Sequence, residues 1–177
     1  EMCIRDSYKT YVKSSTKKIE ESIDWLISVF TDNAGIVKFD EKNHLVYKVE
    51  THNSPSALDP YGGAMTGIVG VNRDPLGTGM GSSLVSNVWG YCLASPFYSS
   101  EIPEGLMHPR RIRDGVHEGV IDGGNQSGIP YSRGFEFFDE RFLGKPLVYC
   151  GTLAKIPVNV TDRPSERKEI EVGDWVV

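Results

Sequence analysis

The stretch KVETHNSPS, residues 48–56, decides how the chain is organised, because ionisable side chains recur there at every second position. Leu45 to Thr51 is a predicted β-strand, in which residues i, i+2 and i+4 point to one face. Lys48, Glu50 and His52 then share a face, provided that the extended backbone continues through His52. The stretch is therefore either an exposed sheet edge or the floor of a polar site.

A predicted hairpin leads into this stretch. Ile36 to Phe39 is its first strand, and the polar residues 40–43 turn the chain back into the strand that ends at Thr51. After that strand, Pro55 disfavours helix at Ser54 and is expected to end the extended segment. The motif strand is thus the second arm of an antiparallel pair.

Upstream of the hairpin, apolar residues at helical spacing predict an amphipathic helix. The helix is expected to start near Ser14 or Ser15, either of which can cap it, and to stop at Asp32–Gly35. Its apolar face would consist of Ile19, Ile23, Leu26, Ile27 and Phe30. Residues 1–7 give no readable pattern.

A glycine-rich segment, residues 62–74, follows the motif. In one interpretation it binds phosphate, with backbone N–H groups and the Thr66 hydroxyl facing an anion. In the other, Gly63, Gly67 and Gly70 lie about one helical turn apart and let a helix pack closely on its neighbours. The segment lacks the Walker and Rossmann spacings, so the pattern alone leaves both interpretations open.

The rest of the chain is predicted to add strands and one more helix. Pro75 is expected to end the glycine-rich segment. The further elements are a strand at residues 84–89, a helix at 110–122 that Gly123 and Gly124 end, and strands at 129–138 and 146–156. We expect an α/β (α+β) fold with a mainly antiparallel sheet, helices on one face and the motif strand near the centre.

Three segments are expected along the chain. The unreadable residues 1–7 come first, a single domain at residues 8–157 follows, and residues 158–177 are a linker and the first strand of a second, truncated domain. A chain of 177 residues is long enough for one sizeable core and too short for two.

Composition restricts the partners. The chain is 39% hydrophobic, has a net charge of −5 with dispersed acidic residues, and has no apolar run near the ~20 residues that span a bilayer. We therefore expect no nucleic acid partner, no membrane partner and a cytoplasmic location. The three isolated cysteines form no C-x-x-C pair, so reduced thiols are expected.

The polar residues of the motif and of the glycine-rich segment recur in a specific order. They read Lys48-x-Glu50-Thr51-His52-Asn53-x-Pro55-Ser56 and then Pro60-x-x-Gly63-Ala64-x-Thr66-Gly67-x-x-Gly70-x-x-Arg73-Asp74. This pattern resembles the synthetase component of phosphoribosylformylglycinamidine synthase (PurL), in the superfamily of aminoimidazole ribonucleotide synthetase. The resemblance spans roughly Phe30 to Pro157 and implies the N-terminal, ATP-binding domain of such an enzyme.

The resemblance also implies a reaction and its partners. In such enzymes ATP phosphorylates the formamide oxygen of formylglycinamide ribonucleotide, and ammonia from a glutaminase displaces the phosphate to give the amidine. ATP and Mg²⁺ are the implied cofactors. The implied partners are a glutaminase domain or subunit and a like domain that pairs with the open sheet face, as a dimer or pseudodimer.

Roles for single residues follow from the same resemblance. His52 would be the general base, and Glu50 and Asp74 would hold Mg²⁺. The ATP contacts would be Lys48, Gly63, Thr66, Gly67 and Gly70. The ribonucleotide contacts would be Thr51, Asn53, Ser54 and Arg73. These residue types suit the chemistry, since lysine binds polyphosphate, carboxylates bind Mg²⁺ and imidazole transfers protons.

Three positions depart from the family pattern. Ser54 stands where a second histidine is usual, Val69 replaces a glycine, and Phe135 replaces a glutamate. The family's upstream histidine box is also missing, so little activity is expected from the isolated chain. Two alternatives remain: a superfamily relative that acts on another acceptor, and a non-catalytic copy of the domain that binds nucleotide or only dimerises.

Overall fold

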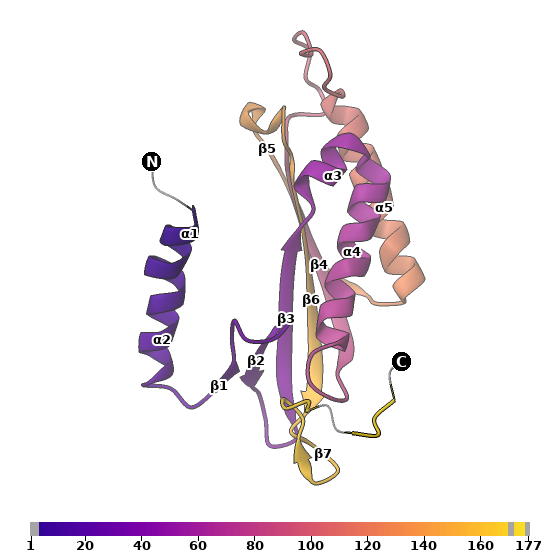
Figure 1. The fold of residues 1–177 in the computed structure, drawn as a ribbon. Helices are drawn as coiled ribbons and strands as arrows, with labels where there is room; N and C mark the ends of the chain where they lie inside the picture. Colours follow the sequence, from indigo (N-terminus) through magenta and orange to yellow (C-terminus); the bar gives the residue numbers. More distant parts are fainter. Residues whose placement is uncertain (1–3, 170–171, 176–177) are drawn as a thin grey trace.

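The computed structural model describes residues 4–169 and 172–175, and a six-stranded sheet forms its centre (Figure 1). The strand order is β1-β2-β3-β6-β4-β5, and every neighbouring pair is antiparallel except β4 and β5. The strands are β1 Leu26–Ser28, β2 Gly35–Lys38, β3 Asn43–Thr51, β4 Ser83–Leu93, β5 Tyr131–Phe138 and β6 Leu147–Pro157. The predicted mainly antiparallel sheet, with the motif strand β3 near its centre, is confirmed.

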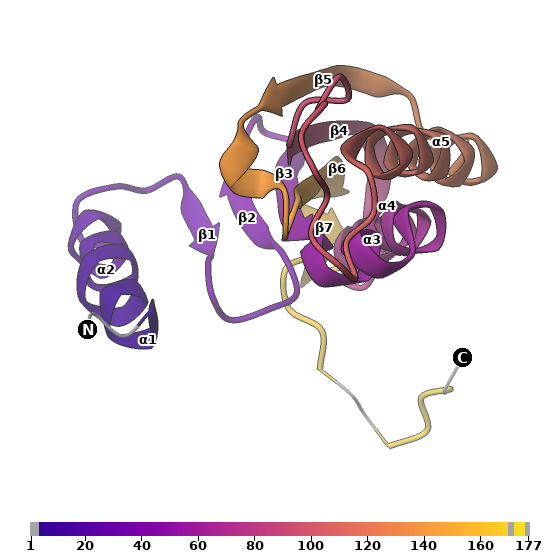
Figure 2. The same cartoon turned by 90° about the horizontal axis from the view of Figure 1, so that it is seen from above.

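Three helices cover one face of this sheet, as predicted, and leave the other face open (Figures 1 and 2). They are α3 Asn53–Leu58, α4 Pro60–Leu76 and α5 Pro109–Ser127. A short 3₁₀ helix, η2 Glu140–Phe142, precedes β6, and a small hairpin of β7 Asn159–Val160 and β8 Arg163–Pro164 follows it. The motif therefore lies where β3 passes beneath the first two of the covering helices.

The predicted hairpin before the motif is also present. β2 and β3 pair antiparallel, with Val37 opposite Leu45. Asp40 closes the turn, because its carboxylate accepts the backbone N–H groups of Lys42 and Asn43, each at 2.7 Å. These two bonds favour the charged carboxylate and lower the pKa of Asp40.

The helix predicted upstream is displaced toward the N-terminus. A helical arm runs from α1 Ile4–Ser7 through the π-helical turn η1 Tyr8–Lys13 to α2 Ser14–Glu20, so residues 4–7 are helical rather than patternless. The arm stands apart from the sheet (Figure 1), and none of the residues of η1 and α2 is buried.

Leu26 to Ser28, predicted as helix, form β1 instead. They pair with β2, and Ile27 packs against the buried cluster at that end of the sheet. Phe30 has φ of 64°, which no α-helix allows. The spacing of the apolar residues suits a helix, but pairing with a distant strand decides the conformation.

Two prolines that were expected to disfavour helix, Pro55 and Pro75, lie inside helices. Pro55 is in the first turn of α3, where the missing N–H would have had no helical partner. Pro75 is in the last turn of α4, which continues to Leu76 and is capped by Gly77. Asp74 is therefore helical.

The helix α5 also passes the expected stop at Gly123 and Gly124. A Cβ at Gly123 would lie 2.4 Å from Ile68 Cγ2, so this glycine serves the close packing of α5 on α4. The helix ends instead at Gly128, whose φ of 68° favours glycine.

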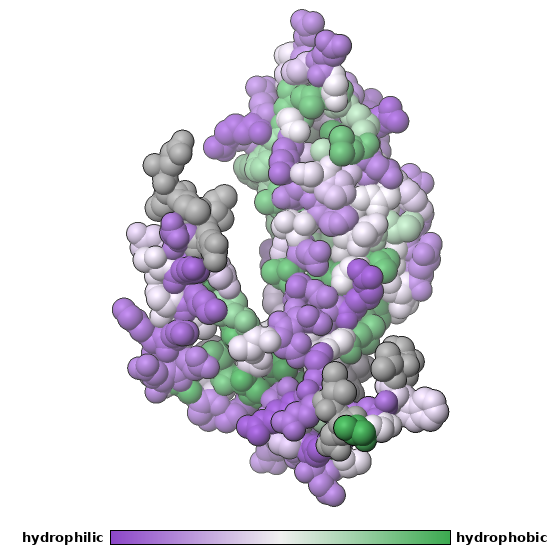
Figure 3. All heavy atoms as spheres, in the orientation of Figure 1, coloured by the Kyte–Doolittle hydropathy of each residue, from purple (hydrophilic) through white to green (hydrophobic). Residues whose placement is uncertain are grey.

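The core lies between the helices and the sheet in two clusters. The larger one joins α4 and α5 to β4 and β6 and contains Ala64, Ile68, Val71, Tyr91, Leu93, Ile112, Val116, Val120, Val148 and Cys150. The smaller one lies near β1 and β2 and contains Ala34, Ile36, Val46, Ala154 and Ile156. In Figure 3 apolar residues also gather at the base of the N-terminal arm.

The segment after residue 157 is only partly described. Ser165 is buried and its carbonyl accepts the N–H of Met80, which ties the segment to the end of α4. Val172 to Trp175, within the expected strand of a second domain, are turn and irregular. Residues 170–171 and 176–177 lie outside the described ranges.

Candidate functional site

The C-terminal half of β3 alternates between the two faces of the sheet as predicted. Lys48 and Glu50 are half-buried beneath the helices, whereas Tyr47, Val49 and Thr51 are exposed on or toward the open face. His52 keeps the pairing with β6, because its N–H donates to Val148 O at 2.8 Å. The ionisable side chains therefore line a polar floor under α4, although this half of β3 pairs with β6 alone, because the pairing with β2 ends at Tyr47.

Lys48 and Asp74 form an ion pair across this floor. The distance from Nζ to Oδ2 is 2.6 Å, and the two side chains are 27% and 28% exposed. Lys48 comes from the central strand and Asp74 from the last turn of α4. The pair joins two motifs that lie far apart in the sequence, and solvent reaches both charges.

His52 is held at the start of α3 by contacts with both helices. Its Nδ1 lies within hydrogen-bonding distance of the Gly63 carbonyl oxygen, and its own carbonyl accepts the Ser56 hydroxyl at 2.6 Å. A carbonyl only accepts, so Nδ1 carries the proton. In the neutral ring Nε2 is then the acceptor, the arrangement that a general base requires.

The neighbours of His52 differ in how they are held. Asn53 Oδ1 accepts the N–H of Val148 at 2.8 Å, which leaves its amide NH₂ to donate to a ligand. Ser54 is exposed in the first turn of α3. Thr51 points to the opposite face from Lys48. The structure thus groups Asn53 and Ser54 with His52 and leaves Thr51 on the other side of the strand.

The glycine-rich segment is the interior of α4 rather than a loop. Its N–H groups follow the helical pattern, and Gly63 N donates to Asp59 O at 2.8 Å. A Cβ at Gly63 would lie 2.5 Å from Ser56 N, and one at Gly67 would lie 3.1 Å from His52 Cβ. These two glycines serve close packing, and the Thr66 hydroxyl donates back to Gly62 O at 2.8 Å.

Gly70 differs from the other glycines of this helix. A Cβ there would meet only the Arg73 guanidinium, at 3.7 Å. Arg73 is exposed in the last turn of α4, next to Asp74. The nucleotide contacts predicted for Gly63, Thr66, Gly67 and Gly70 stay predictions, with only the Arg73 side chain near Gly70 and packed surroundings at Gly63 and Gly67.

A buried polar network that the sequence did not predict holds this end of α4 on the sheet. Asn87 Nδ2 on β4 donates to Asn72 Oδ1 and lies 2.7 Å from Thr152 Oγ1 on β6, and the Thr152 hydroxyl donates to Asn72 Oδ1 at 2.7 Å. All three side chains are buried. Asn87 stood out in the sequence as a polar interruption of an apolar strand, and that interruption was the available signal.

The donor set suits a small divalent cation. Carboxylates are the protein ligands that Mg²⁺ prefers, and it commonly takes one or two of them together with phosphate oxygens and water. Asp74 lies at the C-terminal end of α4, where the helix dipole favours a cation. Glu50 makes no ion pair with another described residue. No three His, Cys, Asp or Glu of the described ranges cluster as a metal site.

The open face of the sheet carries aromatic residues. Tyr47 and Tyr149 share a hydrogen bond of 2.8 Å between their hydroxyls, and they line a shallow hollow of about 270 Å³ together with Phe135 and Arg133. Burial and the Tyr47 hydroxyl raise the pKa of Tyr149. Other exposed apolar residues on the strands include Val49, Val85 and Phe137.

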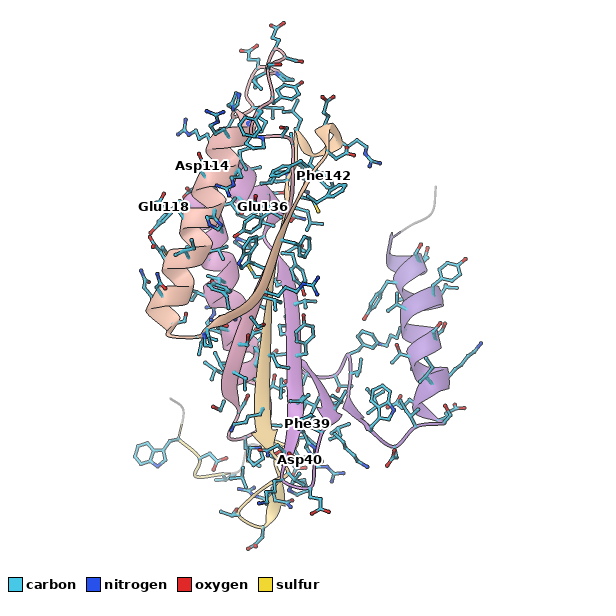
Figure 4. The ribbon with its side chains drawn as sticks, turned by 180° about the vertical axis from the view of Figure 1, so that it is seen from behind. Phe39, Asp40, Asp114, Glu118, Glu136 and Phe142 are labelled. Atoms are coloured by element: carbon cyan, nitrogen blue, oxygen red, sulfur yellow. The ribbon has the colours of Figure 1, made fainter. Side chains whose placement is uncertain are left out.

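A second charged group lies at the far edge of the helical layer. Arg113 Nε on α5 donates to Glu136 Oε1 on β5 at 2.8 Å, and Arg113 Nη1 lies 3.2 Å from Asp114 Oδ1. Figure 4 shows Asp114 and Glu136 near one end of the sheet and Asp40 at the other. These contacts raise the pKa of Arg113 and bind α5 to the edge strand, which is a structural role.

Within the described residues, no helix is long and apolar enough to cross a membrane.

The chain is similar in sequence and in fold to known proteins. Residues 31–156 match the family model described as AIR synthase related protein, N-terminal domain. The phosphoribosylformylglycinamidine synthase subunit PurL of Thermoplasma acidophilum is 38% identical over 177 residues, which cover 100% of this chain and 22% of that protein. The chain therefore spans about a fifth of this curated relative.

Solved structures agree with the sequence match. Thermotoga maritima PurL complexed with ATP has a TM-score of 0.58 and 29% identity, covering 82% of this chain and 22% of that one. The same protein complexed with FGAR has a TM-score of 0.57 and 27% identity, covering 82% and 21%. The chain belongs to the family of AIR synthase related proteins and carries their N-terminal domain over residues 31–156.

Proposed function

We propose that the chain is the ATP-binding part of a ligase of de novo purine biosynthesis. The complete enzyme would convert formylglycinamide ribonucleotide and glutamine-derived ammonia to formylglycinamidine ribonucleotide, through a phosphorylated amide. The observation that carries this proposal is the polar floor of β3, where Lys48 meets Asp74, with His52 directly after the strand as the N-cap of α3. The similarity to PurL structures complexed with ATP and with FGAR supports it.

Each charged residue of the floor has a part in this chemistry. Lys48 would bind the ATP phosphates, and Glu50 and Asp74 would hold Mg²⁺, which supplies positive charge beside the transferred phosphoryl group. His52 would accept a proton at Nε2, because its Nδ1 is engaged by Gly63 O. The Gly63 carbonyl contacts this ring, and Gly67 leaves room for it against α4.

The ribonucleotide would lie over the start of α3 and the end of α4. The Asn53 amide NH₂ and the Ser54 hydroxyl are available there, and the Arg73 guanidinium provides a planar fork for a phosphate. Thr51 would reach the substrate only around the end of β3, since it points to the other face. Asn53 and Arg73 are therefore the stronger candidates.

The partners belong to the complete enzyme. A glutaminase would supply ammonia, and a like domain would cover the open aromatic face of the sheet as a dimer or pseudodimer. A cytoplasmic location suits such an enzyme. The isolated chain is expected to form little or no amidine from ATP, ammonia and formylglycinamide ribonucleotide, because the chain spans about a fifth of a PurL relative.

The test uses three substitutions in the complete enzyme that contains this chain. Glu50→Gln and Asp74→Asn should sharply weaken Mg²⁺-dependent use of ATP, whereas His52→Ala should largely spare ATP affinity and abolish turnover. ATP affinity is measured by calorimetry and turnover by amidine formation. Full turnover of His52→Ala would show that His52 is not the base, and normal activity of all three variants would refute the proposed site.

A further inference from the structure

The last turn of α4 attracts positive charge from two directions. The carbonyls at a helix C-terminus carry a partial negative charge, and Asp74 adds a full one. Lys48 meets the Asp74 carboxylate, and Lys168 reaches the Gly77 carbonyl that caps the same helix. Lysine ammonium groups thus contact two of the acceptors at this end, the Asp74 carboxylate and the Gly77 carbonyl.

The lysine that pairs with Asp74 can move without any change in the backbone. Lys48 lies in the middle of β3, opposite Thr152 of β6, and directly follows Tyr47, the last residue of β3 that pairs with β2. Its four-carbon side chain is about a quarter exposed, so the ammonium can leave Asp74 by a change of side-chain rotamer. Glu50, the next residue on the same face, has no ion-pair partner among the described residues and can add a second carboxylate.

We infer that Lys48 is a tethered cation that takes the place of Mg²⁺ at Asp74 and moves to the phosphates when a metal–nucleotide complex binds. This inference rests on the proposed function, since it assigns one regulatory step to the same site. A metal ion alone must displace the ammonium and loses binding energy by doing so. A metal ion that arrives with nucleotide gives the ammonium a new anionic partner. Lys48 therefore couples metal binding to nucleotide binding and keeps the site from filling with metal alone.

A purely structural ion pair makes a different prediction. Removing Lys48 from such a pair would change the stability of the fold. Whichever of the wild type and the Lys48 variant binds metal more tightly without nucleotide would then also bind it more tightly with nucleotide. The proposed exchange predicts that the variant binds metal more tightly without nucleotide and the wild type binds it more tightly with nucleotide. Lys48 opposes the metal in the nucleotide-free site and assists it in the nucleotide-bound site.

The experiment measures Mn²⁺, a spectroscopic substitute for Mg²⁺, by electron paramagnetic resonance on the 177-residue chain. The variant is Lys48→Met, which keeps an unbranched side chain that is one atom shorter and removes its charge. Its matched control is Lys155→Met, on an exposed position of β6 that alternation places on the open face. A second variant, Lys48→Gln, serves if the first is poorly folded by circular dichroism.

Without nucleotide, Lys48→Met should bind Mn²⁺ about threefold to tenfold more tightly than the wild type, as expected for one partly screened opposing charge. With the ATP analogue AMPPCP, the wild type should bind Mn²⁺ more tightly than Lys48→Met. Lys155→Met should match the wild type in both conditions.

Each outcome is decisive. Equal Mn²⁺ affinity of the wild type and both Lys48 variants without nucleotide, including no binding by any of them, overturns the inference. Tighter binding by the Lys48 variants without a reversal in AMPPCP supports the exchange at Asp74 and refutes the transfer to phosphate. If AMPPCP does not bind the wild type, the nucleotide role proposed for this chain fails, and the comparison without nucleotide still decides whether Lys48 competes with metal.

Discussion

Gly63 and Gly70 lie on the same helix and have opposite surroundings. A Cβ at Gly63 would meet the backbone of Pro55 and Ser56 at 2.5 to 2.8 Å, whereas one at Gly70 would meet only a flexible arginine at 3.7 Å. Gly63→Ala should therefore destabilise the fold by about 1–3 kcal/mol through overpacking. Gly70→Ala should stabilise it by about 0.5–1 kcal/mol, since alanine favours helix.

Urea unfolding of the two variants measures this difference, with the wild type as reference. Two variants of equal stability would mean that α3 and α4 do not approach as closely as described. A Gly70→Ala variant that folds well and loses nucleotide affinity would place the nucleotide beside Gly70.

Cys150 gives the stability of the fold a dependence on alkaline pH. Burial, with the nearby negative charge of Glu50, raises the pKa of its thiol from 9.0 to about 12. A group whose folded pKa is raised stabilises the fold fully below its unfolded pKa, and this contribution is lost as pH rises through the folded value. The contribution of Cys150 should thus disappear between pH 9 and about pH 12.

Urea midpoints measured across that window should fall more steeply for the wild type than for Cys150→Ala. Buried Tyr91, whose pKa is also raised, remains in both proteins and provides a common background. Parallel pH profiles would indicate that the Cys150 thiol is not buried as described.

At the scale of elements, local patterns predicted the strands better than the helix ends. The alternation of Lys48, Glu50 and their neighbours depends only on the period of a strand, so the motif strand and its hairpin were predicted correctly. The arm was misplaced because Leu26 pairs with β2, a contact that helical spacing does not contain. The end of α5 was misplaced because Gly123 packs on Ile68, and a packing glycine resembles a stop signal.

The same distinction applies to the site. The residue types on one face of β3 followed from the sequence, and the resemblance suggested that Asp74 joins them. The ion pair between Lys48 and Asp74 depends on how α4 crosses the sheet. That crossing is held by Asn72 and its buried partners, which come from three separate elements, so no local pattern reveals them.

In the parallel pair β4 and β5, an aromatic side chain of each strand packs over a glycine of the other. The Phe135 ring lies over Gly90, and the Trp89 ring lies over Gly134. A Cβ at Gly90 would be 2.3 Å from Phe135 Cζ, so Gly90→Ala should destabilise the fold by about 1–3 kcal/mol. Adding Phe135→Ala should remove much of that penalty, so the two changes should be strongly non-additive.

A double-mutant cycle by urea unfolding measures this coupling. Gly144→Ala is the control, since a Cβ there has nothing within 4 Å. Additive effects at Gly90 and Phe135 would show that the ring does not occupy the space above the glycine.

At the scale of the whole molecule, the two faces of the sheet are unequal. One is covered by helices, and the other exposes Tyr47, Val49, Phe135 and Phe137. Large exposed apolar faces favour association. The purified chain should therefore dimerise as its concentration rises, and Val49→Lys should shift this equilibrium toward monomer by at least about tenfold, because a charge at a paired apolar face is poorly solvated.

Sedimentation or light scattering over a range of concentrations measures the association. Leu58→Lys is the matched control, because Leu58 is 80% exposed on α3, on the helical side of the sheet. A wild-type chain that stays monomeric at high concentration, or equal effects of the two lysines, would argue against pairing through the open face.

The position of β6 has a consequence for the newly made chain. This strand is synthesised after every other strand of the main sheet, yet it lies between β3 and β4 and pairs with both. The hydrogen-bonded hydroxyls of Tyr47 and Tyr149 are 102 residues apart in the sequence, and contacts between such distant residues form slowly. Until the ribosome has released residue 157, β3 and β4 each present an unpaired edge with no partner in the chain. During that interval the two edges are exposed to pairing with other chains, and a chaperone that covers them would protect this part of the protein.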